Sequence, residues 1–215
     1  DLIEVPATSG VRAYFMTRRL DGAPIDIGTT GGDLTPEVRD NRERLCAALG
    51  LDASRVTMGH QVHGDEVHEV TGGAPGAFVT QTEGTWPQRD GMVTAVGDLP
   101  LAIVTADCVP ILMWRRDGTR VAAVHAGWRG LMAGAVTRAV EQIADPDAIV
   151  AAVGPCAGVC CYQVDDRLRA DFSARFGAGV RAGDRDDLAS AAARALHACG
   201  VREIVVDGSC TICDP

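Results

Sequence analysis

The segment from Leu101 to Val136 constrains the fold more than any other part of the chain. It reads LAIVTADCVPILMWRRDGTRVAAVHAGWRGLMAGAV, in which short apolar runs alternate with polar, reactive residues. The run at residues 101–105 is rich in β-branched side chains and predicts a buried strand, and residues 111–114 predict a second one. The Asp117-Gly118 pair predicts a chain reversal, after which residues 121–124 return as a third strand.

This predicted hairpin brings a cysteine and a histidine together. If the chain folds back at Asp117-Gly118, His125 faces position 110 and Cys108 lies two residues further along the partner strand. Side chains alternate along a strand, so Cys108 and His125 become diagonal neighbours on one face. A thiol and an imidazole so placed can bind one metal ion or form a nucleophile–base pair. Both residues stand at strand ends beside glycine-rich loops, which favours a site over a buried thiol packed on a core histidine.

The remaining patterns predict strands and helices that alternate along the chain. Strands are expected at residues 11–17, 56–64, 66–70, 90–94, 148–153 and 203–207, helices at 35–49, 131–144, 165–176 and 188–199, and loops at 18–33, 72–88 and 126–130. Thr35 and Pro36 are typical of a helix start, and Gly50 of a helix end. Because several strand pairs are joined by short turns, we expect an α/β (α+β) fold with a mixed sheet.

Length and charge narrow the class of protein. The chain has 215 residues, 47% of them hydrophobic, which is enough for a single well-cored domain over residues 1–215. A net charge of −9 disfavours a nucleic-acid partner, and neither a membrane-spanning run nor a signal peptide is found. The eight cysteines are therefore interpreted as reduced thiols. We expect a cytoplasmic monomer or weak homo-oligomer.

His63 is the third candidate site residue. His60 and His63 lie in a predicted strand, where positions three apart point to opposite faces, so only one of them is expected at the site. Gly64 marks a change of direction after His63, which favours His63 and leaves His60 a structural role. Zinc in catalytic sites takes three such ligands and leaves the fourth position open to water, whose pKa falls to roughly 7.

The other cysteines give weaker patterns. Cys156 and Cys160 are spaced one residue too widely for the paired cysteines of zinc nucleobase deaminases, and no His-x-Glu motif accompanies them. Together with Cys210 and Cys213 they offer four thiolates for a structural zinc site. The adjacency of Cys160 and Cys161 argues against that arrangement, so the sequence favours packed thiols and predicts that the Cys210–Cys213 pair holds no zinc.

Five motifs carry a family resemblance. They are Gln61-Val62-His63-Gly64, Thr105-Ala106-Asp107-Cys108-Val109-Pro110, His125-Ala126-Gly127-Trp128-Arg129-Gly130, Gly154-Pro155 followed by Cys160-Cys161-Tyr162, and Cys210-Thr211-Ile212-Cys213-Asp214-Pro215. In order and spacing, from about Thr17 onward, the chain resembles the YfiH family of laccase-domain proteins. This family was formerly described as multicopper polyphenol oxidoreductases and is now regarded as purine nucleoside phosphorylases, also named peptidoglycan editing factors.

The resemblance implies a fold, a metal and a chemistry. The fold would be a single domain with sheets packed between helices, related in shape to Cys-His hydrolases. Zinc, with copper as the alternative, would be held by His63, Cys108 and His125. The substrates would be a purine nucleoside and phosphate, with phosphorolysis of adenosine, inosine and methylthioadenosine and a second activity of adenosine deamination. We expect Cys108, His125, Asp107 and Arg129 to be catalytic, and Gln61, Asp90 and Arg129 to bind substrate.

The chain departs from the family pattern at two places, and two other functions stay open. Residues 25–28 read Ile-Asp-Ile-Gly where the family has Phe-Asn-Leu-Gly, and Gln163 replaces an acidic residue. A metal-free hydrolase would use Cys108 as nucleophile and His125 as base on an amide such as a peptidoglycan precursor. A copper oxidase of polyphenols is disfavoured, because multicopper centres need more than five histidines.

Overall fold

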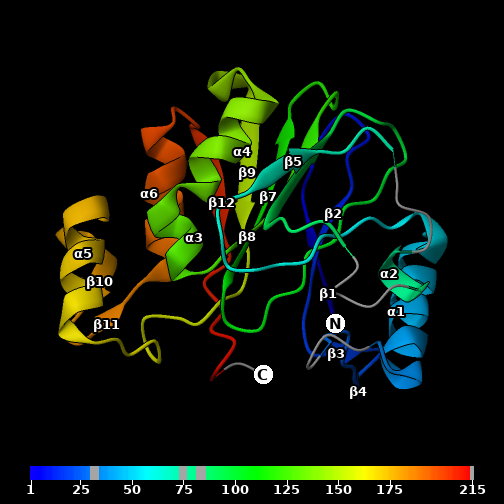
Figure 1. The fold of residues 1–215 in the computed structure, drawn as a ribbon, viewed down its shortest axis with the longest axis horizontal. Helices are drawn as coiled ribbons and strands as arrows, with labels where there is room; N and C mark the ends of the chain where they lie inside the picture. The colour runs from blue at the N-terminus through cyan, green and yellow to red at the C-terminus, as the bar shows by residue number, and fades with distance from the viewer. Residues whose placement is uncertain (30–33, 73–76, 81–85, 214–215) are drawn as a thin grey trace.

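The fold is organised around one six-stranded sheet. The computed structural model describes residues 1–29, 34–72, 77–80 and 86–213. The strands are β5 (Val67–Glu69), β6 (Gly91–Thr94), β7 (Val109–Arg115), β8 (Val121–Ala126), β9 (Ile149–Val153) and β12 (Glu203–Val206). Their order is β12-β9-β7-β8-β6-β5, and Figure 1 shows the sheet in the middle of the molecule. The β12–β9 and β5–β6 pairs are parallel and the other three are antiparallel, so the predicted mixed sheet is confirmed.

The central hairpin has the predicted register. Gly118 takes a left-handed φ of 73° in the turn between β7 and β8, a conformation that glycine adopts without strain. The Asp117 carboxylate accepts the Thr119 backbone N–H at 3.0 Å and so closes the turn. Pro110 pairs with His125, as the alternation along the two strands predicts.

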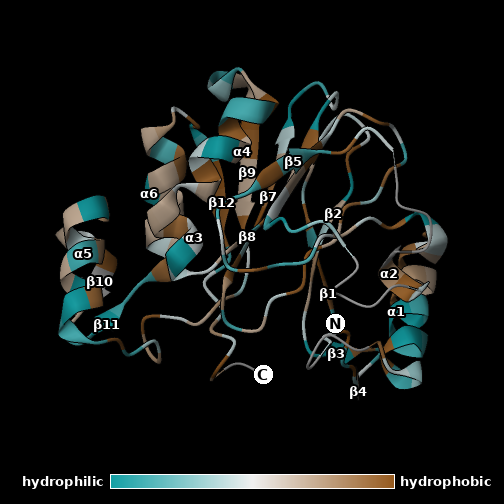
Figure 2. Cartoon of the chain, viewed as in Figure 1, coloured by the Kyte–Doolittle hydropathy of each residue, from teal (hydrophilic) through white to brown (hydrophobic). Residues whose placement is uncertain are grey.

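Both faces of the sheet are covered, which explains why the strands are apolar on both sides. One face packs against α3 (Trp128–Ala133), α4 (Ala135–Ile143) and α6 (Leu188–Ala198), and α5 (Asp166–Phe176) packs against α6. The other face lies under a hairpin of β1 (Leu2–Val5) and β2 (Ala13–Met16), where Phe15 joins a cluster with Trp114 and Val150. Figure 2 shows the hydrophobic strands between these layers and the hydrophilic outer surfaces of α1 and α5.

The helix α1 (Pro36–Leu49) begins and ends as predicted. Thr35 Oγ1 accepts the Val38 N–H at 3.3 Å, and Gly50 ends the helix with a left-handed φ of 66°. α1 packs beside α2 (Ala77–Thr80), and together with neighbouring loops they form a second apolar cluster. The smaller elements are β3 (Arg19–Leu20), β4 (Ala23–Pro24), η2 (Ala53–Arg55), η4 (Pro146–Ala148), η5 (Ala178–Val180), β10 (Arg181–Ala182) and β11 (Arg185–Asp186).

Two predicted strands are wrong. Residues 101–105 and 56–64 make only isolated β-bridges, Thr57 to Leu101 and His60 to Gln88. In the 101–105 segment the Gln61 side chain, not a neighbouring strand, takes the main-chain hydrogen bonds of Val104. Apolar β-branched composition predicted a ladder strand, whereas these residues line a second cluster outside the sheet.

The boundary between the predicted loop at 126–130 and the predicted helix at 131–144 is also wrong, and the structure has two helices, α3 and α4, in place of one. α3 already begins at Trp128, because the Leu131 N–H reaches Gly127 O, and it ends at Gly134 with a φ of 101°. Arg129 is therefore a helical residue. Residues 30–33 of the first predicted loop, 73–76 and 81–85 of the second, and the last motif's Asp214-Pro215 lie outside the described residues. Among the described helices, none has the length and apolar content needed to cross a membrane.

Candidate functional site

Three side chains converge at one edge of the central hairpin. The donor atoms of His63, Cys108 and His125 all lie within 4.8 Å of one another. Cys108 directly precedes β7 and His125 is the last residue but one of β8, so the hairpin register alone brings these two together. His63 comes from the turn after residue 62, and its ring meets that of His125 edge to face at 4.8 Å between centroids.

A buried carboxylate holds both histidines in place. The Asp90 side chain is 0% exposed and lies directly before β6. It accepts the backbone N–H groups of Val62, His63 and Gly64 at 3.2, 2.9 and 2.7 Å, which wraps the turn around the carboxylate. His63 takes a left-handed φ of 61° in this turn, a conformation that needs such support. The same carboxylate bonds His125 Nδ1 at 2.7 Å, which leaves Nε2 of His125 for a metal or a proton.

The pKa values of the two histidines are shifted in opposite directions. Burial acts to lower the pKa of His125, but the hydrogen bonds to Asp90 and Cys108 outweigh it and raise this pKa to about 9. Burial, followed by the neighbouring His125, lowers the pKa of His63. Burial acts to raise the pKa of Asp90, but His125 and the backbone N–H groups lower it. The carboxylate is therefore ionised and the more exposed histidine neutral at neutral pH.

Two glycines of the third motif let α3 approach this site. A Cβ added at Gly127 would lie 2.8 Å from Cys108 Sγ and 3.3 Å from His63 Cδ2. A Cβ added at Gly130 would lie 2.8 Å from the carbonyl oxygen of Gly64. Such distances are shorter than contact distances between non-bonded atoms, so glycine is required for the observed approach.

We predict that Gly127→Ala disturbs the site more than the fold. The backbone φ of Gly127 is −70°, which alanine adopts without strain, so the damage comes from the clash with Cys108. Metal affinity is expected to fall by about 10-fold or more, because ligands must hold their geometry closely. Competition with a chelator measures this. Gly72→Ala is the control, because nothing lies within 4 Å of a Cβ built there, and an equal loss in both variants would refute the prediction.

The structure gives Gln61 a role in shaping the chain. Its side-chain amide donates to Val104 O at 2.7 Å and accepts the Val104 N–H at 2.9 Å. Both ends of the amide are thus used to hold the segment before Cys108 against the segment before His63. Asp90 is wholly buried beneath the two histidines. These placements fit positioning roles better than the substrate contacts predicted for Gln61 and Asp90 from the sequence.

Asp107 and Arg129 lie on the exposed side of the site. The carboxylate of Asp107 accepts the hydroxyl of Thr211 at 3.0 Å, and its carbonyl accepts the Ala157 N–H at 2.9 Å. The guanidinium carbon of Arg129 lies 4.7 Å from the centre of the Trp128 ring. Arg129 is close enough to help lower the pKa of His63. The structure thus brings both residues near the three donors without burying them.

Tyr162 is a neighbour of the site that the sequence did not single out. Burial, with smaller effects of Cys108 and Asp186, raises the pKa of Tyr162 to about 12, while Arg129 acts to lower it. Tyr162 therefore lies close enough to Cys108 and Arg129 to feel the charge of both. Its position directly after Cys160-Cys161 in the fourth motif was the only sequence feature that marked it.

The residues present fit a catalytic zinc ion. One thiol and two imidazoles are ligands that zinc prefers, and three protein ligands leave a fourth position free. Asp90 supplies the outer carboxylate that such histidines commonly bond. His63 and Cys108 keep the site accessible, since neither is fully buried. Copper also accepts these donor atoms, so the ligand set by itself does not choose between the two metals.

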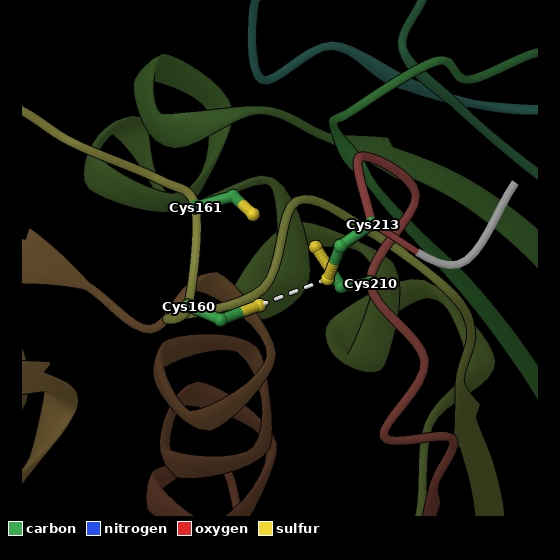
Figure 3. A group of neighbouring side chains, drawn as sticks. All are labelled: Cys160, Cys161, Cys210 and Cys213. Atoms are coloured by element: carbon green, nitrogen blue, oxygen red, sulfur yellow. Dashed lines mark hydrogen bonds between the residues drawn. The ribbon is translucent and has the colours of Figure 1, made fainter.

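The remaining cysteines are arranged differently from the expected packed pairs. Cys156 is buried, and its backbone forms an isolated parallel β-bridge with that of Cys210. The sulfurs of Cys160, Cys161, Cys210 and Cys213 instead lie within 4.8 Å of one another (Figure 3). The sequence pattern offered Cys156 and not Cys161 for such a group and disfavoured it, because only the fold shows that the sulfurs of Cys160 and Cys161 lie beside those of the C-terminal pair.

Comparison with known proteins gives one consistent family. Residues 13–215 match the family model described as multi-copper polyphenol oxidoreductase laccase. The chain is 36% identical over 219 residues to the purine nucleoside phosphorylase YfiH of Shigella flexneri, covering 96% of this chain and 86% of that protein. It is 38% identical over 199 residues to the purine nucleoside phosphorylase Rv2149c of Mycobacterium tuberculosis, covering 88% and 76% of the two chains.

Solved structures share the fold. The Neisseria meningitidis protein NMB0706 superposes with a TM-score of 0.82 at 29% identity, covering 98% of this chain and 88% of that one. YlmD from Geobacillus stearothermophilus superposes with a TM-score of 0.80 at 30% identity, covering 89% and 77%. The expected fold class is thus confirmed by whole-chain similarity as well as by the sheet order.

Proposed function

Because the chain belongs to the YfiH family, we propose that it is a metal-dependent purine nucleoside phosphorylase. Relatives that carry this name are 36–38% identical to it over most of their length. In phosphorolysis an oxygen of inorganic phosphate bonds to C1′ of the ribose while the bond from C1′ to the purine nitrogen breaks. Adenosine, inosine and methylthioadenosine are the proposed substrates, and adenosine deamination is the proposed second activity.

The convergence of His63, Cys108 and His125 is the observation that carries this proposal. Zinc held there would supply Lewis-acid chemistry and would polarise oxygen groups near the substrate. The protein's own part is to keep the donors in place. Asp90 fixes the orientation of His125 and, through the backbone of the turn, that of His63. Asp107, next to Cys108 and held by Thr211, is the exposed carboxylate that we propose as proton carrier.

Arg129 is the proposed phosphate ligand. An acidic protein must attract an anion locally, and this exposed guanidinium lies on the open side of the site. α3 has only six residues, so the guanidinium and not the helix is expected to supply the attraction. The alternative is that stacking on Trp128, at 4.7 Å, is the whole role of Arg129.

A variant separates these two roles of Arg129. We expect Arg129→Lys to raise the KM for phosphate by roughly 10-fold, equivalent to ~1.4 kcal/mol, because lysine cannot bind phosphate through two parallel hydrogen bonds. The KM for adenosine and the rate of deamination should change less, since no phosphate takes part in deamination. Arg138→Lys, at an exposed arginine paired with Asp65, is the matched control. Equal losses in both reactions would assign Arg129 a structural role.

A metal-free cysteine hydrolase is the second candidate. Cys108, His125 and Asp90 have the order of a nucleophile, a base and an orienting carboxylate, with 2.7 Å between His125 Nδ1 and Asp90. His63 has no role in such a triad, which is why we rank it below the metal enzyme. A multicopper oxidase ranks last, because only two of the chain's five histidines are in the site.

One experiment tests the first proposal against the second. The purified protein is incubated with adenosine, with and without inorganic phosphate, and the products are resolved by chromatography while the metal content is measured. Adenine that forms only with phosphate, in protein carrying metal at this site, supports the phosphorylase. A metal-free protein that is inert toward nucleosides, and whose Cys108 is alkylated rapidly, supports the hydrolase.

A further inference from the structure

We propose that Cys160, Cys161, Cys210 and Cys213 form a second metal site, a four-thiolate zinc centre separate from the His63–Cys108–His125 site. It would join the segment that follows β9 to the turn that follows β12. Its role would be structural, because four protein ligands leave no position for a substrate.

The spacing of the sulfurs fits one zinc ion. With zinc–sulfur bonds of about 2.3 Å in a tetrahedron, neighbouring sulfurs lie about 3.8 Å apart. The four Sγ atoms are all within 4.8 Å of one another, and those of Cys160 and Cys213 are 3.4 Å apart. In Figure 3 the four side chains point into a common space from two segments of the chain. No separation exceeds the tetrahedral value by more than about 1 Å.

The backbone around the sulfurs is already fixed. The backbones of Cys156 and Cys210 form a parallel β-bridge, and the Thr211 N–H donates to Cys156 O at 3.0 Å. These contacts set the two segments side by side. The Gly158 N–H donates to Cys210 Sγ at 3.2 Å, a contact that favours a thiolate. A Cβ at Gly158 would lie 3.3 Å from the sulfurs of both Cys160 and Cys210. Two segments far apart in sequence are thus held close enough to share a metal.

Apolar packing holds residues 210–213 of the C-terminal turn only at Cys210. Cys210 is buried, but Ile212 is 52% exposed and Cys213 is also exposed. Apolar burial therefore contributes little here, and a metal with four thiolates would provide the missing cross-link. The turn also contacts the His63–Cys108–His125 site, because the Thr211 hydroxyl donates to the carboxylate of Asp107, the residue before Cys108.

Soft thiolates select zinc among the common divalent ions, and its tetrahedral preference suits four of them. The competing arrangement is a disulfide between Cys160 and Cys213. Their sulfurs are 3.4 Å apart and both cysteines are free, whereas a disulfide needs about 2.05 Å. The sequence argument against a shared site, the adjacency of Cys160 and Cys161, fails because both sulfurs reach the same space.

Metal analysis of the whole chain tests the proposal. Protein purified under reducing conditions with zinc present is expected to hold about two zinc ions per chain. Cys213→Ser and Cys160→Ser should each hold about one, and Cys46→Ser, at a buried cysteine in α1, should still hold about two. Cys108→Ala should lose the other ion and keep this one. Unchanged zinc in both Cys213→Ser and Cys160→Ser, or a mass that shows a disulfide in the wild type, would overturn the proposal.

Cobalt gives a readout that does not depend on the first site. Cys108→Ala loaded with Co(II) should show the intense thiolate-to-metal charge-transfer absorption of a four-thiolate centre. Adding Cys213→Ser to this variant should remove most of that absorption. Cys108→Ala protein that takes up no cobalt and shows no such absorption would refute the site, whatever the outcome for phosphorolysis.

Discussion

Replacing Cys108 with alanine is expected to abolish phosphorolysis and to empty the His63–Cys108–His125 site of metal. The thiolate would supply one of three ligands, and the remaining two histidines cannot hold zinc at neutral pH with comparable affinity. The loss of turnover should exceed the roughly 10–100-fold that follows removal of an outer-shell partner. The fold should persist, since Cys108 is only partly buried and the change costs about 1 kcal/mol.

Two other cysteines serve as controls for this variant. Cys46 is buried in α1, where burial raises the pKa of its thiol to about 11, and Cys199 lies at the end of α6. Alanine at either position should lower the free energy of unfolding by about 1 kcal/mol and leave turnover unchanged. Retained turnover with full metal content in Cys108→Ala would remove Cys108 from the site. A large loss of turnover in folded Cys199→Ala would place the site elsewhere.

Asp90→Asn is expected to damage stability and metal binding together. The carboxylate accepts three backbone N–H groups and His125 Nδ1, whereas asparagine would turn an N–H toward some of these donors. The free energy of unfolding should fall by about 3 kcal/mol, as for other buried charges whose partners are left unsatisfied. Metal affinity and turnover should fall roughly 10–100-fold, because His63 and His125 lose their common support.

Urea unfolding and chelator competition measure these two effects. Asp65→Asn is the matched control, because Asp65 lies beside Gly64 and pairs with Arg138 at 2.8 Å on the surface. Its loss should lower the free energy of unfolding by less than about 1 kcal/mol and leave metal affinity unchanged. If Asp90→Asn behaved like Asp65→Asn, the buried carboxylate would not be what positions the histidines.

The sequence by itself determined the parts of this protein that depend on neighbours along the chain. Side chains alternate along a strand and the Asp117-Gly118 turn fixes where β7 reverses, so the proximity of Cys108 and His125 followed from local pattern. The limits of α1 followed from Thr35 and Gly50 in the same way, because capping involves residues within one turn.

Only the tertiary structure decided which distant residues support the site. The bond from the His63 N–H to Asp90 spans 27 positions, and the contact between Cys160 and Cys213 spans 53. No sequence periodicity links residues so far apart. Where the sequence predicted strand pairing for residues 101–105, the structure has hydrogen bonds from the Gln61 side chain to the backbone of Val104. A buried carboxylate, a close glycine approach or a cluster of sulfurs forms only when packing removes the alternatives, since an isolated segment can satisfy the same polar groups with water.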